Sequence, residues 1–458
     1  MLTRGGAHDW DDRDEIPHTT EGTETTLQIR VEDMTGNLAA SAVTTIKVDL
    51  GALPVRDLVS LTHPDPTKWY PASNPEFNWN APADESGIEG YSYLFDRTEG
   101  TIPDEKIDTT DNSIAFTDTE DGIWYFHIRA KDRSGNWGEP IHYQVRIDVS
   151  SPPAPEVTSP AHPKDRWAGN NEPAFNWTAF DPSGITGYSF ILDQATTTTV
   201  DDISEGTTTT GSSTGLKDGI YWFHIKARDG AGAWGETSHY KIKIDTTGPE
   251  NLSIDYPLSN YWHKEPVTNY YGKASDAVSG IDPSTLEYNY NNQGFKPFKD
   301  DAGAHDWDDS DEIPRTKEEA TLQIRVKDMA GNPAVSAVMT IKVDLGTLPV
   351  QDIASLTHPD STKWYPDNNP EFSWKSPADE SGIEGYSYLF DRTEGTIPDE
   401  KIDTTDNRVA FTDTEDGIWY FHLRSKDMAG NWSEPVHLKI RIDTTPQLLF
   451  SGPQMSSQ

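Results

Sequence analysis

The strongest constraint on this chain is that it repeats itself. The stretch ESGIEGYSYLFDRTEGTIPDEKIDTTDN, which starts at Glu85, recurs unchanged from Glu380. GALPVRDLVSLTHPD from Gly51 recurs with few changes as GTLPVQDIASLTHPD from Gly346, at the same interval of 295 residues. A fixed interval of self-similarity is typical of an array of similar structural units. The sequence therefore predicts a string of small modules rather than one large domain.

A shorter repeat lies inside the long one and defines a unit that we name module B. Its copies share a Pro-x-Phe-x-Trp string and a strand-like string that begins DGI and ends in aspartate. The tryptophans are Trp79, Trp177 and Trp374, and the aspartates that close the copies are Asp148, Asp245 and Asp443. Module B is predicted at residues 50–148, 149–245 and 345–443.

A second unit, module A, is predicted complete at residues 246–344. Its last part also makes up residues 1–49, which we interpret as a truncated copy. Residues 444–458 resemble a linker followed by the start of a truncated next module. Met1 thus falls in the middle of a module, and we expect the chain to be a piece of a longer protein. The absence of an apolar signal region after Met1 then says nothing about compartment.

Hydrophobic periodicity predicts strands. In the first B module, Trp124, Phe126, Ile128 and Ala130 alternate with polar or amphipathic residues, and a period of two indicates a strand with one buried face. Turn strings such as DESG from Asp84 separate such segments. About seven short strands per module without a helical period predict an all-β chain of tandem β-sandwiches.

The same residues carry a family resemblance. Module B resembles fibronectin type III domains through its early tryptophan, the I-x-G-Y strand from Ile88 and the DGIWYFHIRAKD strand from Asp121. Module A resembles the immunoglobulin-like repeats of bacterial surface adhesins through GKASDAVSGID from Gly272 and TLQIRVKDMAGN from Thr321. The resemblance implies immunoglobulin-like and fibronectin type III-like sandwiches in an extended array. Two copies have tryptophan, Trp124 and Trp419, where the family has a corner tyrosine.

Composition narrows the possible partners. The 458 residues carry a formal net charge of −39, which disfavours binding to nucleic acid and to anionic membranes. There is no cysteine, so disulfides and metal–thiolate sites are excluded. No apolar run is long enough to insert into a membrane. The excess of carboxylates is typical of a solvated extracellular protein, of a halophilic protein or of a calcium-binding protein.

The sequence contains none of the common catalytic motifs. Each distinctive residue also recurs once per module, which is typical of packing and linker residues and not of an active site. We therefore predict that the chain is not an enzyme.

One candidate binding surface is a stripe on the long strand of module B. A histidine is flanked by an aromatic residue in each copy, and alternation predicts that the stripe faces outward. This position could contact a glycan or a partner protein, or it could serve cross-strand pairing on a solvated face. The residues are Tyr125 and His127, Trp222 and His224, and Tyr420 and His422.

An acidic loop in module A is a candidate calcium site. Asp306, Asp308 and Ser310 alternate, so that their oxygens fall on one side of a turn, and Glu312 could complete the ligand set. Calcium prefers six to eight oxygen ligands, which such a loop and its backbone could supply. The alternative is a solvated acidic loop without an ion.

The module junctions are a second candidate calcium site. Asp148, Asp245 and Asp344 end their modules shortly before a proline, as do Asp49 and Asp443. Such an aspartate could share calcium with an acidic loop of its neighbour or with the recurring D-x-x-G-N turn, which also has a purely structural interpretation.

We therefore predict a structural spacer or adhesin stalk on a prokaryotic cell surface, which calcium could stiffen and whose partners are other modules of the same protein. Two alternatives stay open: accessory modules of a secreted hydrolase, and glycan-binding modules that use the exposed aromatic residues.

Overall fold

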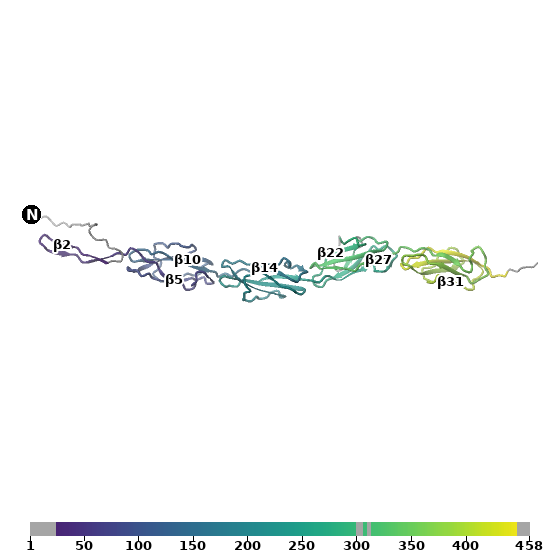
Figure 1. Ribbon diagram of the computed structural model, residues 1–458, viewed down its shortest axis with the longest axis horizontal. Helices are drawn as coiled ribbons and strands as arrows, with labels where there is room; N and C mark the ends of the chain where they lie inside the picture. Colours follow the sequence, from purple (N-terminus) through teal and green to yellow (C-terminus); the bar gives the residue numbers. More distant parts are fainter. Residues whose placement is uncertain (1–23, 299–305, 309–312, 447–458) are drawn as a thin grey trace, which may run out of the picture. The chain divides into compact units, whose positions relative to one another are not determined.

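The computed structural model describes residues 24–298, 306–308 and 313–446. Throughout these residues the regular elements are β-strands, and no helix is present that could cross a membrane. By compactness the chain divides into two units. Residues 1–164, 174–213 and 220–242 belong to the first, and residues 165–173, 214–219 and 243–458 to the second. The prediction of an all-β chain of tandem sandwiches is confirmed (Figure 1).

The first B module is made of two sheets. Their strands pair antiparallel, except that the two-residue strand β6 pairs parallel with β11. The smaller sheet has the order β5-β7-β9, and the larger has the order β6-β11-β10-β8. The strands are β5 (Arg56–Ser60), β6 (Trp69–Tyr70), β7 (Glu76–Asn80), β8 (Ile88–Asp96), β9 (Ser113–Ala115), β10 (Gly122–Asp132) and β11 (Ile141–Ile147).

The other two B modules repeat this arrangement. The second has sheets β12-β14-β16 and β13-β18-β17-β15, and the third has β28-β29-β31 and β30-β32-β33. The strands of the second are β12 (Glu156–Thr158), β13 (Trp167–Ala168), β14 (Ala174–Thr178), β15 (Ile185–Asp193), β16 (Thr210–Ser212), β17 (Gly219–Asp229) and β18 (Ser238–Ile244). Those of the third are β28 (Gln351–Ser355), β29 (Glu371–Lys375), β30 (Ile383–Asp391), β31 (Arg408–Ala410), β32 (Gly417–Asp427) and β33 (Val436–Ile442).

Module A has a three-stranded sheet, β19-β21-β24, and a larger sheet, β20-β27-β25-β22-β23, with β26 paired to β25. The strands are β19 (Glu250–Tyr256), β20 (Trp262–His263), β21 (Tyr271–Ser275), β22 (Ile281–Tyr290), β23 (Lys296–Pro297), β24 (Asp306–Asp308), β25 (Ala320–Asp328), β26 (Pro333–Val335) and β27 (Met339–Val343).

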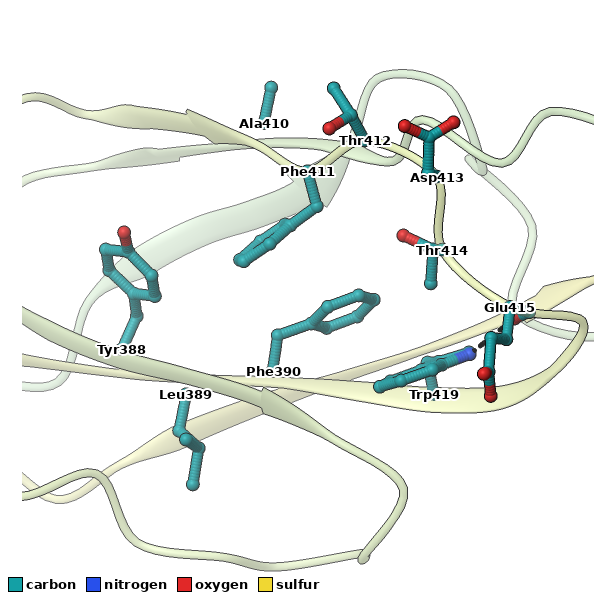
Figure 2. A pocket seen from close by; sticks show the side chains of 10 residues that line it. All are labelled: Tyr388, Leu389, Phe390, Ala410, Phe411, Thr412, Asp413, Thr414, Glu415 and Trp419. Carbon is teal, nitrogen blue, oxygen red and sulfur yellow. Dashed lines mark hydrogen bonds between the residues drawn. The ribbon is translucent and has the colours of Figure 1, made fainter.

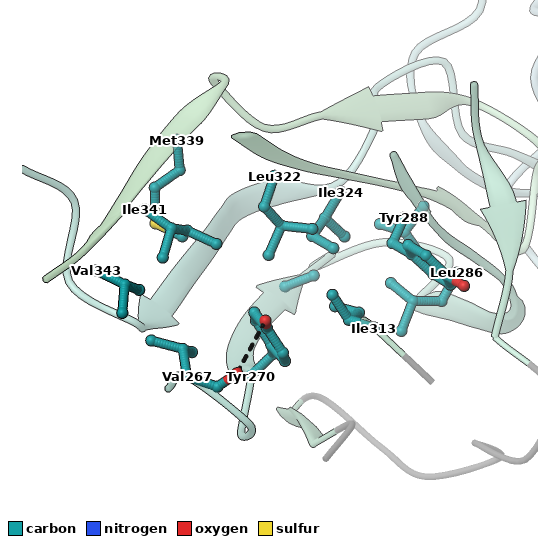
Figure 3. Packing of buried hydrophobic residues seen from close by; sticks show 12 residues of the cluster. Val267, Tyr270, Leu286, Tyr288, Ile313, Leu322, Ile324, Met339, Ile341 and Val343 are labelled. Carbon is teal, nitrogen blue, oxygen red and sulfur yellow. Dashed lines mark hydrogen bonds between the residues drawn. The ribbon is translucent and has the colours of Figure 1, made fainter. Parts of the chain in front are cut away.

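Each sandwich has its own apolar core. In the first B module, Phe77 and Trp79 of β7 pack against Phe126 of β10, and the rings of Phe77 and Phe126 stack 4.3 Å apart. In module A, aliphatic residues of β25 and β27 surround Tyr270, as Figure 3 shows for Leu322 and Ile341. These residues are the inward halves of period-two strands, so the predicted pattern accounts for the cores.

Residues 24–49, the described part of the first A copy, form four short strands. β1 (Glu24–Leu27) pairs with β4 (Thr44–Lys47), and β2 (Arg30–Glu32) pairs with β3 (Leu38–Ala40). Val31 and Leu38 are exposed here, whereas the matching Val326 of the complete module is buried. Among the described residues of this copy, these apolar side chains are therefore left uncovered.

In modules B and A alike, the last strand pairs in parallel with a short segment near the start of the same module. β6 pairs with β11, β13 with β18, and β20 with β27. The closing aspartate extends each pair by one hydrogen bond; the Asp148 N–H, for example, donates to the Tyr70 carbonyl at 3.0 Å. The junction aspartates are therefore held by backbone contacts to the modules that they close.

Candidate metal centres

The predicted ligands of the acidic loop are only partly described. Asp306 and Asp308 lie on β24, which pairs with β21, so this segment is a strand and not the turn that was expected. Ser310 and Glu312 lie outside the described residues. Calcium binding by this set stays a prediction.

The predicted outward-facing stripe is wrong in its histidines. His127, His224 and His422 are 0% exposed, and the flanking Tyr125, Trp222 and Tyr420 are half-buried. The reason is that β10 lies between β8 and β11, and the segment after β8 folds back over the outer face of the sheet. Thr109 of that segment bridges to Tyr91, and its Asp108 accepts a hydrogen bond from the buried Ser92.

Each buried histidine is the centre of a hydrogen-bonded chain of three side chains. The Nδ1 atoms of His127 and His142 lie 2.6 Å apart, and Nε2 of His127 lies 3.3 Å from Oδ1 of Asp96. The other modules repeat this chain with His224, His239 and Asp193, and with His422, His437 and Asp391. The histidines are thus satisfied internally and do not form an exposed binding surface.

The candidate metal centres lie where one module ends and the next begins. At each of four places, three aspartates from distant parts of the sequence come together, each with one carboxylate oxygen within 4.8 Å of the others. One aspartate closes a module, and the other two begin turns of the module that follows. The sets are Asp49, Asp84 and Asp132; Asp148, Asp181 and Asp229; Asp245, Asp276 and Asp328; and Asp344, Asp379 and Asp427.

The predicted junction ligands Asp148, Asp245 and Asp344 each belong to one of these sets, together with an aspartate of a D-x-x-G-N or D-x-x-G-A turn. Sequence reasoning missed the third member, which begins a D-x-S-G or D-x-x-S-G turn. We interpreted that string only as a turn signal. Its repetition at all four places, as Asp84, Asp181, Asp276 and Asp379, was the available signal.

Both turns fix one carboxylate oxygen through local hydrogen bonds. In the first, Oδ1 of Asp84 accepts bonds from the N–H groups of Ser86 and Gly87, and Gly87 has the positive φ of 82° that favours glycine. In the second, Oδ1 of Asp132 accepts a bond from the Asn136 N–H at 2.8 Å. The turns are structural, as predicted, and they also set the orientation of the carboxylates.

The Asp148 set is the most enclosed of the four. Asp148 is 1% exposed, Asp181 5% and Asp229 0%, and the Oδ2 atoms of Asp148 and Asp229 have no hydrogen-bond partner. Burial, followed by repulsion from Asp181 and Asp229, raises the pKa of Asp148. In the fourth set, Oδ2 of the buried Asp344 is also without a partner, and burial raises the pKa of Asp427.

These properties fit a hard cation. Buried carboxylates without partners are costly, and a bound cation is one of the few ways to compensate them. The side chains that meet offer only oxygen, which is the ligand type preferred by calcium and magnesium, whereas zinc prefers nitrogen and sulfur. Three carboxylates supply the start of a calcium coordination shell.

A surface hollow in the third B module is a separate feature. It is lined by Tyr388, Phe390, Phe411 and Trp419, with Asp413 and Glu415 at its rim (Figure 2). Phe390 stacks on Phe411 at 4.5 Å and on Trp419 at 4.9 Å. The rings pack on one another, so the hollow is the open end of the aromatic core.

Comparisons with known proteins give structural neighbours only. No protein-family model matches the chain, and no curated protein matches it. The chain is similar to three fibronectin domains of chicken CNTN1 (11% identity, 63% of this chain and 99% of that one, TM-score 0.25) and to titin domains A168–A170 (11%, 63% and 99%, TM-score 0.29). It is also similar to fibronectin(III)-like modules of Clostridium thermocellum CbhA (15%, 44% and 100%, TM-score 0.25). The assignment of tandem sandwiches rests on the sheets described above.

Proposed function

We propose that this chain is a non-enzymatic spacer of a secreted or cell-surface prokaryotic protein, and that calcium bound by the aspartate sets fixes each module to the next. One observation carries the proposal. The same three-aspartate arrangement recurs at four successive module junctions, and two of the four contain buried carboxylate oxygens that have no partner.

The position of the sets explains why a cation would act on the junctions. Each set takes one aspartate from the end of a module and two from turns of the following module. A cation that binds all three therefore links the two modules, and its binding free energy opposes their separation. Calcium suits this role better than magnesium because it tolerates irregular coordination and gives up its water more readily.

If the protein is an adhesin, the adhesive contacts would then be made by other modules of the protein, which this spacer holds away from the surface. The glycan-binding alternative has less support than the sequence suggested, because the histidines of its proposed surface are buried. The hydrolase-accessory alternative has no residue of this chain in its favour.

Calcium titration of the full chain tests the proposal. We expect millimolar calcium to raise the melting temperature and EGTA to lower it, because a ligand that binds only the folded state stabilises it. At a calcium concentration of a hundred times Kd, the gain is about 2.7 kcal/mol for each site. Differential scanning calorimetry measures the shift, and magnesium at the same concentration should give a smaller one.

Asp229→Asn supplies the matched variant. It removes one charge from a buried set, so in EGTA it should leave the chain as stable as the unmodified protein or more so, whereas in calcium it should reduce the stabilisation. Asp111→Asn, at an exposed aspartate outside the sets, is the control and should respond to calcium as the unmodified chain does. Melting curves that do not respond to calcium in any of the three proteins would contradict the proposal.

A further inference from the structure

The four junctions differ at one residue of the D-x-x-G-N turn. Three copies end the turn with asparagine, and the second B module ends it with Ala233. The three asparagines are Asn136, Asn332 and Asn431, and they occupy equivalent places beside the aspartate sets. The difference therefore falls directly on the candidate metal centres.

Each asparagine forms a direct bridge across its junction. The Nδ2 group of Asn431 donates to Oδ2 of Asp427 at 2.8 Å and to the backbone carbonyl of Asp344 at 2.8 Å. Asn136 makes the same two contacts with Asp132 and Asp49, and Asn332 makes them with Asp328 and Asp245. Three junctions thus have an amide link between the end of one module and the turn of the next, and this link needs no cation.

The second junction has no such link. Ala233 contributes only its backbone N–H, which donates to Oδ1 of Asp229 at 2.8 Å. Oδ2 of Asp229, which the asparagine amide would otherwise engage, has no partner, and neither has Oδ2 of Asp148. This is also the one set among the described residues whose three aspartates are all buried.

We propose that the junctions are of two kinds, and that the junction at Asp148 is a calcium-controlled hinge. This inference rests on the proposed function. Three junctions are held by an asparagine amide whether or not calcium is bound. The Asp148 junction lacks this amide link and depends on the cation, and it loosens when calcium is removed because three buried carboxylates then repel one another. The identity of one residue, alanine or asparagine, decides which kind a junction is.

Hydrogen–deuterium exchange of the full chain tests the hinge, with calcium chloride as the probe and EGTA as the calcium-free state. We expect the turn at residues 229–235 to exchange at least about tenfold faster in EGTA than in calcium. The turns at 132–138, 328–334 and 427–433 should change by less than about threefold. The peptides are distinguishable because the four turns differ in sequence.

Two reciprocal variants separate the hinge from the general proposal. Ala233→Asn should protect the 229–235 turn in EGTA and remove most of its calcium response. Asn431→Ala should give the 427–433 turn the response that the 229–235 turn had, which keeps the test valid even if Ala233→Asn folds poorly. Equal responses at all four turns, or no change in response in both variants, would overturn the hinge and leave calcium binding intact. A complete lack of response at every turn would instead overturn the proposed function, and the hinge with it.

Discussion

The histidine pairs, each of which has one buried ring, impose a limit on protonation that single histidines do not have. At an Nδ1–Nδ1 distance of 2.6 Å, one ring must donate and the other accept, so the contact between His127 and His142 contains one proton. If Nε2 of His127 donates to Asp96, then His142 is the donor to His127. The pair can accept one further proton, with Asp96 as the counter-ion. If both rings were fully protonated, the Nδ1–H groups of His127 and His142 would point at each other.

The charged groups around each pair do not remove this limit. The first pair faces Asp96 from β8, with Glu99 in the segment beyond it, and Tyr125 stacks against His127. The third pair has the same surroundings in Asp391, Glu394 and Tyr420, and the second has Asp193. Burial, and then repulsion from the partner histidine, lowers the pKa of His142, His239 and His437.

The sign of the resulting pH dependence follows from the lowered pKa. The unfolded chain takes up protons on these histidines near pH 6.5, and the folded chain takes them up only at lower pH, so stability falls as the pH drops below about 6.5. We therefore expect the unfolding equilibrium of each B module to shift toward the unfolded state as the pH falls through that range.

Calorimetry at pH 7.5 and 5.0 measures this loss, with the triple variant His142→Gln, His239→Gln and His437→Gln as the comparison. Glutamine retains a polar contact but has no titrating ring, so the variant should lose less stability on acidification than the unmodified chain. Carrying out the comparison in EGTA keeps calcium binding out of the difference. Equal losses in both proteins would show that the histidine pairs do not titrate as described.

At the scale of elements, the edge strand of the larger sheet, β8 or β30, lies very close to the segment that covers it. A Cβ atom added at Gly90 of β8 would lie 2.5 Å from Ile107, and one added at Gly385 of β30 would lie 2.6 Å from Ile402. Only a residue without a side chain allows the covering segment to lie this near the strand. The same segment contacts the histidine chain of the module, because the Thr101 side chain lies beside Asp96.

Gly90→Ala and Gly385→Ala should therefore displace the covering segments. Overpacking of this kind costs typically about 1–3 kcal/mol, and here it should also expose His127 or His422 to solvent. Hydrogen exchange of residues 101–109 and 396–404 should rise in the substituted module and stay unchanged in the other, which serves as the internal control. Gly100→Ala, at a loop position with open space around it, tests for nonspecific effects, although its positive φ of 80° also carries some strain.

The elements also show how far sequence reasoning extends. Strict alternation in residues 122–132 correctly predicts the inward face of β10, because Phe126, Ile128 and Ala130 form part of the core. It fails for His127, because burial on the outer face is produced by a polar segment that has no period of its own. At the position where the resemblance implied a corner tyrosine, the chain has Trp124, whose indole N–H donates to the Glu120 carbonyl at 2.8 Å.

The sequence predicted two of the three aspartates in each set and missed the third. Asp148 and the D-x-x-G-N turn stand out in the sequence because they are repeated and lie at the module ends. Asp181 joins them only through the folding of the second B module, since its D-x-S-G turn lies at a distance along the chain from both partners. Contacts between turns that are far apart in the sequence depend on the topology of the sheets, and a repeat pattern along the chain cannot predict them.

At the scale of the whole molecule, the proposed role as a spacer requires an extended chain in solution. A compact globule of 458 residues would have a radius of gyration of about 23 Å. We expect small-angle scattering in calcium to give a value well above this, and EGTA to broaden the distribution of interatomic distances. Sodium chloride at equal ionic strength is the control for simple screening of the −39 charge. A radius near the globular value in calcium would rule out a spacer.

The parallel pairing of the last strand of each module has a mechanical consequence. If the two ends of the chain are pulled apart, β6 and β11 are loaded lengthwise against each other, so several hydrogen bonds must break together before the first B module extends. Asp148 belongs to this clamp through its N–H bond to Tyr70, while its side chain reaches Asp181 and Asp229 of the next module. Tension would therefore pass through a single residue from the backbone clamp of one module to the cation site of the next. An array built in this way transmits load at the points where its modules meet.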